Sequence, residues 1–110
     1  MDRATVTAKL VQTGINRETV ELFLDWLKAN PEIWQAFQAR ALQAIRAGVK
    51  HWGAKAIFET ARFDAALKRR GAFKVNNNYA AYMGRLFILK YPSHQSFFEF
   101  RTVKGLRNVG

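Results

Sequence analysis

The chain has 110 residues, which is room for one domain, and 49% of them are hydrophobic, which is enough for a core without covalent staples. It contains no cysteine, so a disulfide framework, a thiolate metal site and a cysteine nucleophile are all excluded. The formal net charge of +10 is uneven: residues 1–35 carry four bases and five acids, whereas residues 36–110 carry fourteen bases and three acids. This asymmetry points to a polyanionic partner, and the alternative is that the charge only keeps a basic protein soluble.

Residues 1–14 are polar, rich in threonine and only weakly periodic. We therefore expect a flexible N-terminal segment that is frayed or loosely docked. We find neither the apolar run of a signal peptide nor a stretch long enough to span a bilayer. The sequence predicts a soluble, cytoplasmic protein that does not contact a membrane.

Two amphipathic helices are predicted next. The first begins near Asn16, a good N-cap, and ends at Asn30. Asn30 and Pro31 then begin a second helix, with proline at its first position, and Gly48 stops it. Their apolar stripes match, so we expect the two helices to pack as a hairpin or a corner.

A third helix is predicted over residues 53–68. Lys55, Arg62 and Arg69 are seven residues apart, so they share its outer face. Glu59 lies four residues after Lys55 and three before Arg62, and ordinary surface ion pairs are therefore an alternative reading of this face.

The rest of the chain mixes short β signals with one more helix. Lys68–Arg70 ends the third helix, where cations favour the helix dipole, and Gly71 supplies the stop. Residues 72–75 alternate like a short strand, residues 78–90 carry helical spacing, and residues 97–103 are typical of a second strand.

These elements predict a mainly α fold, a four-helix single domain over residues 15–104 with a short C-terminal β element and a basic tail over residues 105–110. Helix 53–68, a turn, and helix 78–90 followed by a basic β segment have the outline of a helix-turn-helix or winged helix. The turn over residues 71–75 is longer than this motif usually has.

Candidate nucleic-acid-binding residues lie at the start of helix 78–90 and on the basic segments around it. In a helix-turn-helix these N-terminal side chains face bases or phosphates, where Asn binds adenine and Arg binds phosphate or guanine. The asparagines also suit capping and turns, and the tyrosines suit the edge of a core or stacking on unpaired bases. We expect the following residues to bind nucleic acid, with DNA favoured: Lys50, Lys55, Arg62, Lys68, Arg69, Arg70, Lys74, Asn77, Asn78, Tyr79, Tyr82, Arg85, Arg101 and Lys104.

Signals for catalysis are weak. His51 and His94 are far apart and lack metal-ligand spacing, and no phosphate-binding loop or nucleophile elbow occurs. Asp64 with residues 99–101 loosely resembles a nuclease site, but pairing of Asp64 with Lys68 four residues on is the simpler interpretation. We expect no enzymatic activity, no catalytic residue, no metal and no cofactor.

Several segments together resemble a family of small uncharacterised proteins from phage and bacterial genomes. The matching pieces are residues 53–59, 73–79 (FKVNNNY), 85–87, 91–92 and 97–101 (FFEFR), which is about half of the chain. The resemblance implies a phage or mobile-element context, with a regulator or accessory factor as the expected role. The alternative is a phage-encoded inhibitor of a host defence complex, similar to an anti-CRISPR protein, that binds a nucleic-acid-handling protein complex.

Overall fold

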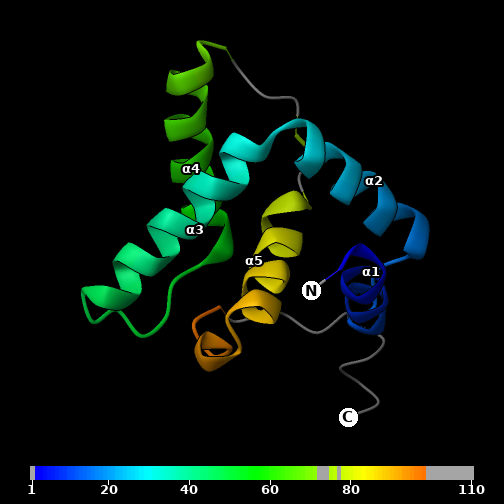
Figure 1. The fold of residues 1–110 in the computed structure, drawn as a ribbon. Helices are drawn as coiled ribbons and strands as arrows, with labels where there is room; N and C mark the ends of the chain where they lie inside the picture. The colour runs from blue at the N-terminus through cyan, green and yellow to red at the C-terminus, as the bar shows by residue number, and fades with distance from the viewer. Residues whose placement is uncertain (1, 72–74, 77, 99–110) are drawn as a thin grey trace.

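The computed structural model describes residues 2–71, 75–76 and 78–98, which fold into five α-helices and one short 3-10 helix (Figure 1). In chain order the elements are α1 (Arg3–Gln12), α2 (Arg17–Ala29), α3 (Pro31–Arg46), α4 (Ala54–Arg69), α5 (Tyr79–Lys90) and η1 (Pro92–His94). No helix in the described part of the chain is both long and apolar enough to cross a bilayer.

The N-terminal segment forms a helix, so the predicted number of four helices is wrong. The carboxylate of Asp2 caps α1 by accepting a backbone N–H of the first turn at 2.8 Å. Leu10 is fully buried, and Arg3 forms ion pairs with Glu21 and Asp25 of α2, each at 2.8 Å. Tertiary packing therefore holds a helix that its own sequence indicates only weakly.

Helices α2 and α3 confirm the two amphipathic helices predicted before residue 48. The side chain of Asn16 accepts the Thr19 N–H at 3.3 Å at the start of α2, and Pro31 occupies the first turn of α3. Asn30 joins them, and its side-chain amide donates to the carbonyl of Trp26 at 2.9 Å. The same carbonyl also accepts the Asn30 backbone N–H at 3.0 Å, so two hydrogen bonds hold Asn30 at the corner between the two helices.

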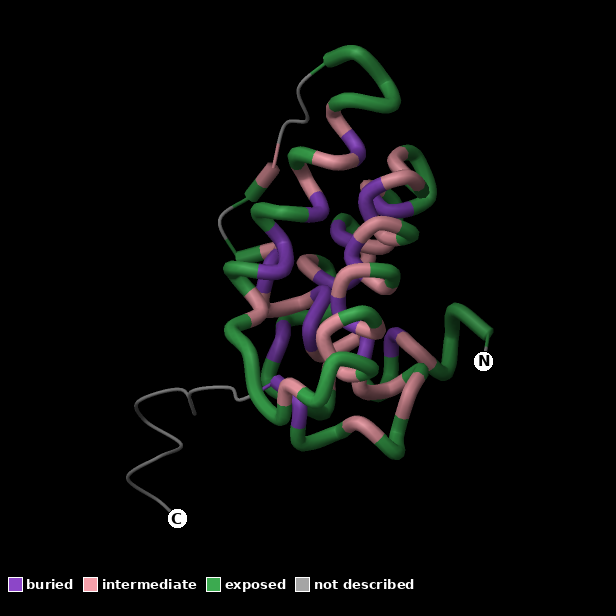
Figure 2. The backbone as a smooth tube through the Cα atoms, turned by 90° about the vertical axis from the view of Figure 1, so that its left-hand side faces the viewer, coloured by how far each residue is buried: buried purple, intermediate pink, exposed green. Residues whose placement is uncertain are grey.

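All five α-helices contribute to one hydrophobic core. Leu10 of α1, Phe23 of α2, Phe37 of α3, Ala61 of α4 and Phe87 of α5 are each fully buried. Helix α5 lies between the α3–α4 pair and the α1–α2 pair, and the C-terminal end of α4 extends beyond the other helices (Figure 1). That end is exposed (Figure 2).

The predicted C-terminal β element is also wrong, since the described residues contain no strand. Phe97 and Phe98 follow η1 and a turn, and each is only 3% exposed. A half-buried strand would bury alternate residues, whereas here two consecutive rings enter the core. Phe98 lies 5.5 Å from both Phe37 and Phe87 between ring centroids. Val75 is not in a strand either, and residues 72–74 and 99–103 of the predicted strands lie outside the described residues.

Candidate nucleic-acid interface

The start of α5, predicted to read bases, is built into the core. The ring of Tyr79 lies 4.7 Å from Trp26 and 5.2 Å from Phe23, and Tyr82 lies 5.6 Å from Phe23, between centroids. Burial raises the pKa of the Tyr79 hydroxyl, with a smaller contribution from Tyr82. These rings pack against α2, and both residues are half-buried.

Arg85, one turn further along α5, has a structural partner. Its guanidinium donates to the carbonyl oxygen of Thr13 at 3.2 Å and to the Thr13 hydroxyl at 3.0 Å. This contact ties α5 to the end of α1. The helix-turn-helix or winged-helix assignment is therefore wrong, because its supposed recognition helix is an internal helix and no wing occurs in the described residues.

The asparagine segment before α5 forms a local turn. The side-chain oxygen of Asn76 accepts the Asn78 N–H at 2.8 Å, and its carbonyl accepts the Tyr79 N–H at 3.0 Å. Asn78 is exposed at the N-cap position but makes no capping hydrogen bond through its side chain. Four other predicted binding residues lie outside the described residues: Lys74, Asn77, Arg101 and Lys104.

The remaining predicted cations gather on α4 and the segment that leads into it. Arg62 is half-buried, and its guanidinium lies 3.8 Å from the Glu59 carboxylate. For Arg62, the alternative interpretation of the outer face as surface ion pairs is therefore confirmed. Arg69 is exposed but donates to the side-chain oxygen of Asn30 at 2.7 Å. The other four are exposed: Lys50, Lys55, Lys68 and Arg70.

Asp64, the carboxylate of the loosely nuclease-like pattern, is paired with Arg40 of α3. The Arg40 guanidinium donates to the two carboxylate oxygens of Asp64 at 2.7 and 3.0 Å. These hydrogen bonds lower the pKa of the Asp64 carboxyl, and the charge of Lys68 contributes in the same direction. Asp64 therefore joins α3 to α4, and Lys68 is a secondary neighbour. Residues 99–101 of the nuclease-like pattern lie outside the described residues.

An apolar stripe on the solvent face of α4 was not predicted from the sequence. Phe63 and Leu67 are 64% and 62% exposed, and their spacing of four residues makes them neighbours on the helix. The core side of α4 is formed by Ile57, Phe58 and Ala61 among others, so the helix is apolar on two opposite faces. The available signal was that Phe63 and Leu67 do not share the helical spacing of Ile57, Phe58 and Ala61, although both are large and apolar.

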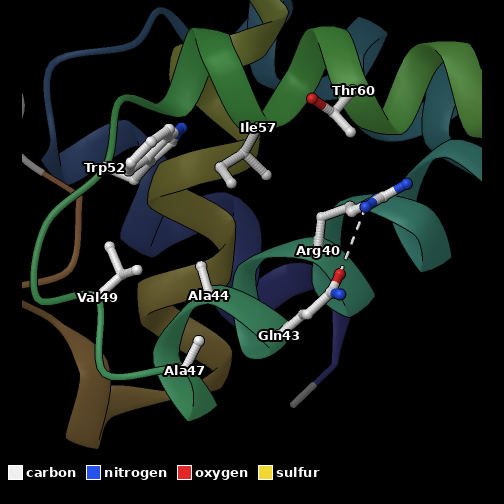
Figure 3. A pocket seen from close by; sticks show the side chains of 8 residues that line it. All are labelled: Arg40, Gln43, Ala44, Ala47, Val49, Trp52, Ile57 and Thr60. Carbon is white, nitrogen blue, oxygen red and sulfur yellow. Dashed lines mark hydrogen bonds between the residues drawn. The ribbon is translucent and has the colours of Figure 1, made fainter.

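An open groove of about 280 Å³ adjoins this helix (Figure 3). Trp52, which is 51% exposed, and Thr60 line its α4 side, and Arg40 and Gln43 line its α3 side. Arg40 donates to the side-chain oxygen of Gln43 at 3.4 Å. The groove therefore presents an exposed indole beside Arg40 and Gln43, and the guanidinium of Arg40 is already bonded to Asp64 and Gln43.

No protein-family model, curated protein or solved structure matches this chain. The resemblance of residues 53–101 to small phage and bacterial proteins thus stays a prediction. Support for a function therefore comes from the side chains of α4 and its surroundings.

Proposed function

We propose that this protein binds nucleic acid through the exposed surface of α4 and the residues next to it. The observation that carries the proposal is the mixture of exposed rings and excess cations on a single helix and the residues before it. We define the α4 surface as Trp52, Lys55, Arg62, Phe63, Leu67, Lys68 and Arg70.

Charge on α4 exceeds what its own carboxylates neutralise. Glu59 lies beside Arg62, and Asp64 is held by Arg40 of α3. Lys55, Lys68 and Arg70 are therefore in excess of the carboxylates that α4 carries. Cations of this kind bind phosphates and release the counterions condensed on a nucleic acid.

The exposed rings favour a strand with unpaired bases over a duplex. Stacking of a base on an aromatic side chain contributes about 1–3 kcal/mol, and it requires a base face that a duplex conceals. Trp52 and Phe63 expose 51% and 64% of their surface. Neither stacking nor phosphate contact depends on a 2′-hydroxyl, so single-stranded DNA and single-stranded RNA are both expected ligands.

The test is a fluorescence-anisotropy titration with single-stranded DNA, single-stranded RNA and duplex DNA over a series of salt concentrations. We expect single strands to bind more tightly than duplex, with an affinity that falls by about 0.7 log units per log unit of salt for each phosphate neutralised. Absence of binding to every nucleic acid at low salt would overturn the proposal.

Charge-reversal variants distinguish binding by the α4 surface from binding that depends only on the net charge of the protein. Lys68→Glu with Arg70→Glu should weaken single-strand binding by at least about tenfold, because two phosphate contacts become repulsive. The matched control is Lys9→Glu with Lys28→Glu, which makes the same change in net charge at exposed positions in the last turns of α1 and α2. Equal losses in the two double variants would show that binding follows net charge alone.

A ring variant tests stacking in the same assay. Phe63→Ala should weaken single-strand binding by about 5-fold or more, as expected for the loss of about 1–3 kcal/mol. Leu22→Ala is the control, since Leu22 is 59% exposed but lies on α2. Equal affinity of Phe63→Ala and the wild type would remove stacking from the proposal.

Leu67 favours a second candidate, which is an inhibitor that docks on a nucleic-acid-handling complex of a host defence system. A leucine side chain does not stack on bases, and an exposed apolar pair such as Phe63 and Leu67 is typical of protein interfaces. This candidate predicts that the protein inhibits cleavage by a purified CRISPR-type effector, and that Leu67→Ala reduces inhibition. Inhibition without any nucleic-acid binding would favour it over the first.

A further inference from the structure

A second hollow lies where the segment after α3 meets η1 and the turn that follows η1. Its volume is about 290 Å³. The only two histidines of the chain, His51 and His94, both line it. The polar residues that line it are Lys50, His51, Ser93, His94 and Ser96, and the apolar ones are Ile45, Val49 and Phe97.

Two hydrogen bonds hold the two sides of this pocket together. The Trp52 N–H donates to the carbonyl of Phe97 at 3.2 Å, and His51 Nδ1 lies 3.0 Å from the carbonyl oxygen of Ser96. A carbonyl oxygen can only accept, so His51 donates from Nδ1, and this bond fixes the orientation of its ring. Phe97, 3% exposed, anchors the turn in the core. The pocket is thus part of the packed structure.

The chemistry of the lining selects an anion rich in oxygen. It offers the Lys50 ammonium group, two hydroxyls and the His94 imidazole, and the described residues that line it include no carboxylate. Groups of this kind donate hydrogen bonds to phosphate oxygens, and a charged acceptor strengthens such bonds. The volume falls just below the ~300–1,000 Å³ of pockets that enclose a drug-sized ligand, so a phosphate group fits within it.

The position of the pocket connects it with the α4 surface. Val49 lines both this pocket and the groove that contains Trp52, so the two hollows adjoin across residues 49–52. A strand whose bases contact Trp52 can therefore present a phosphate to the pocket. Because a terminal phosphate monoester carries more charge than an internal diester, it gains the most from these donors.

We propose that this pocket binds the terminal phosphate of a nucleic-acid strand. The inference depends on the proposed function, since it names the part of the nucleic acid that the protein recognises. The same phosphate monoester chemistry occurs in free mononucleotides, and the experiment separates these two sources.

The experiment compares oligonucleotides of one sequence that end in a 5′-phosphate, a 3′-phosphate or hydroxyls only, by anisotropy at fixed salt. The wild type should bind one of the phosphorylated strands about tenfold more tightly than the hydroxyl strand. Ser93→Ala with His94→Gln should lose this preference and keep the affinity for the hydroxyl strand. Ser93 is exposed and His94 is half-buried, and a far-UV circular dichroism spectrum checks that the variant folds.

A second measurement keeps the pocket testable if no oligonucleotide binds. Titration of 15N-labelled protein with inorganic phosphate and with a nucleoside monophosphate should shift the amide signals of Lys50, His51, His94 and Ser96. Equal binding of all strands overturns the terminal-phosphate proposal while the proposed function stands. Shifts from the monophosphate without binding of any strand overturn the proposed function and assign the pocket to a free mononucleotide. No shifts overturn the phosphate pocket itself.

Discussion

Phe98 gives a quantitative test of how the C-terminal segment joins the core. It is 3% exposed, and its ring centroid lies 5.5 Å from those of Phe37 and Phe87 and 4.8 Å from that of Phe97. Phe98→Ala removes a buried ring and leaves a cavity, which costs about 3–5 kcal/mol in the cores of other proteins. Small domains have a free energy of unfolding of about 5–15 kcal/mol, so the variant should lose a large part of it.

Urea unfolding followed by far-UV circular dichroism measures this loss, and Phe63→Ala is the matched control. Phe63 is 64% exposed on α4, and alanine has the higher helix propensity, so its replacement should change the free energy of unfolding by less than about 0.5 kcal/mol. The reasoning is refuted if Phe98→Ala costs less than about 1 kcal/mol, or if the two variants are equally destabilised.

Three further predictions concern α4 and α1. Asp64→Asn should destabilise the protein at neutral pH, because hydrogen bonds from Arg40 hold the pKa of Asp64 in the folded state below its unfolded value. The stabilisation that the Asp64 carboxylate gives is therefore present above the unfolded pKa, and it disappears as the pH falls through the folded pKa. Chemical unfolding at several pH values should show the wild type and variant converging in acid. Arg70→Gly should raise the free energy of unfolding by about 0.5–1 kcal/mol, since Arg70 adopts φ 56° at the C-cap of α4 and glycine accepts this conformation more easily; a lower melting temperature would contradict this. Arg85→Met should speed amide hydrogen exchange in α1 through loss of the bonds to Thr13, and unchanged protection would show that α1 is held by apolar packing alone.

The helices α2, α3 and α4 could be predicted from the sequence because local signals agree there. Asn16 and Pro31 mark helix starts, and apolar residues recur at helical spacing. The apolar residues of α1 show only weak helical periodicity, and Leu10 gains its burial through contact with other helices. The segment from Phe97 onward is rich in aromatic residues, which favour strands when a sheet is present to accept them. Here Phe97 and Phe98 pack into the aromatic core instead, and no local sequence pattern predicts this packing.

The candidate site divides in the same way. The cations of α4 were predictable because their positions along one helix follow from spacing alone. The contacts of Tyr79 with Trp26 and of Arg85 with Thr13 could not be predicted, because these partners lie far away in the sequence. The convergence of the two histidines on one pocket joins segments on either side of α4 and α5, so only the tertiary structure reveals it.

The cations and the exposed apolar side chains of the α4 surface interact with water in opposite ways. Water solvates Lys55, Lys68 and Arg70 well, whereas the exposed rings and Leu67 gain from leaving water. Where helices pack, this protein pairs its charges, as Arg40 does with Asp64. On α4 it keeps cations beside apolar groups. A ligand that satisfies both must present anions and flat apolar faces at close intervals, and an unpaired nucleic-acid strand has both in every nucleotide. A protein partner would need acidic residues around an apolar ridge, so the response of binding to Phe63→Ala and to Leu67→Ala distinguishes the two.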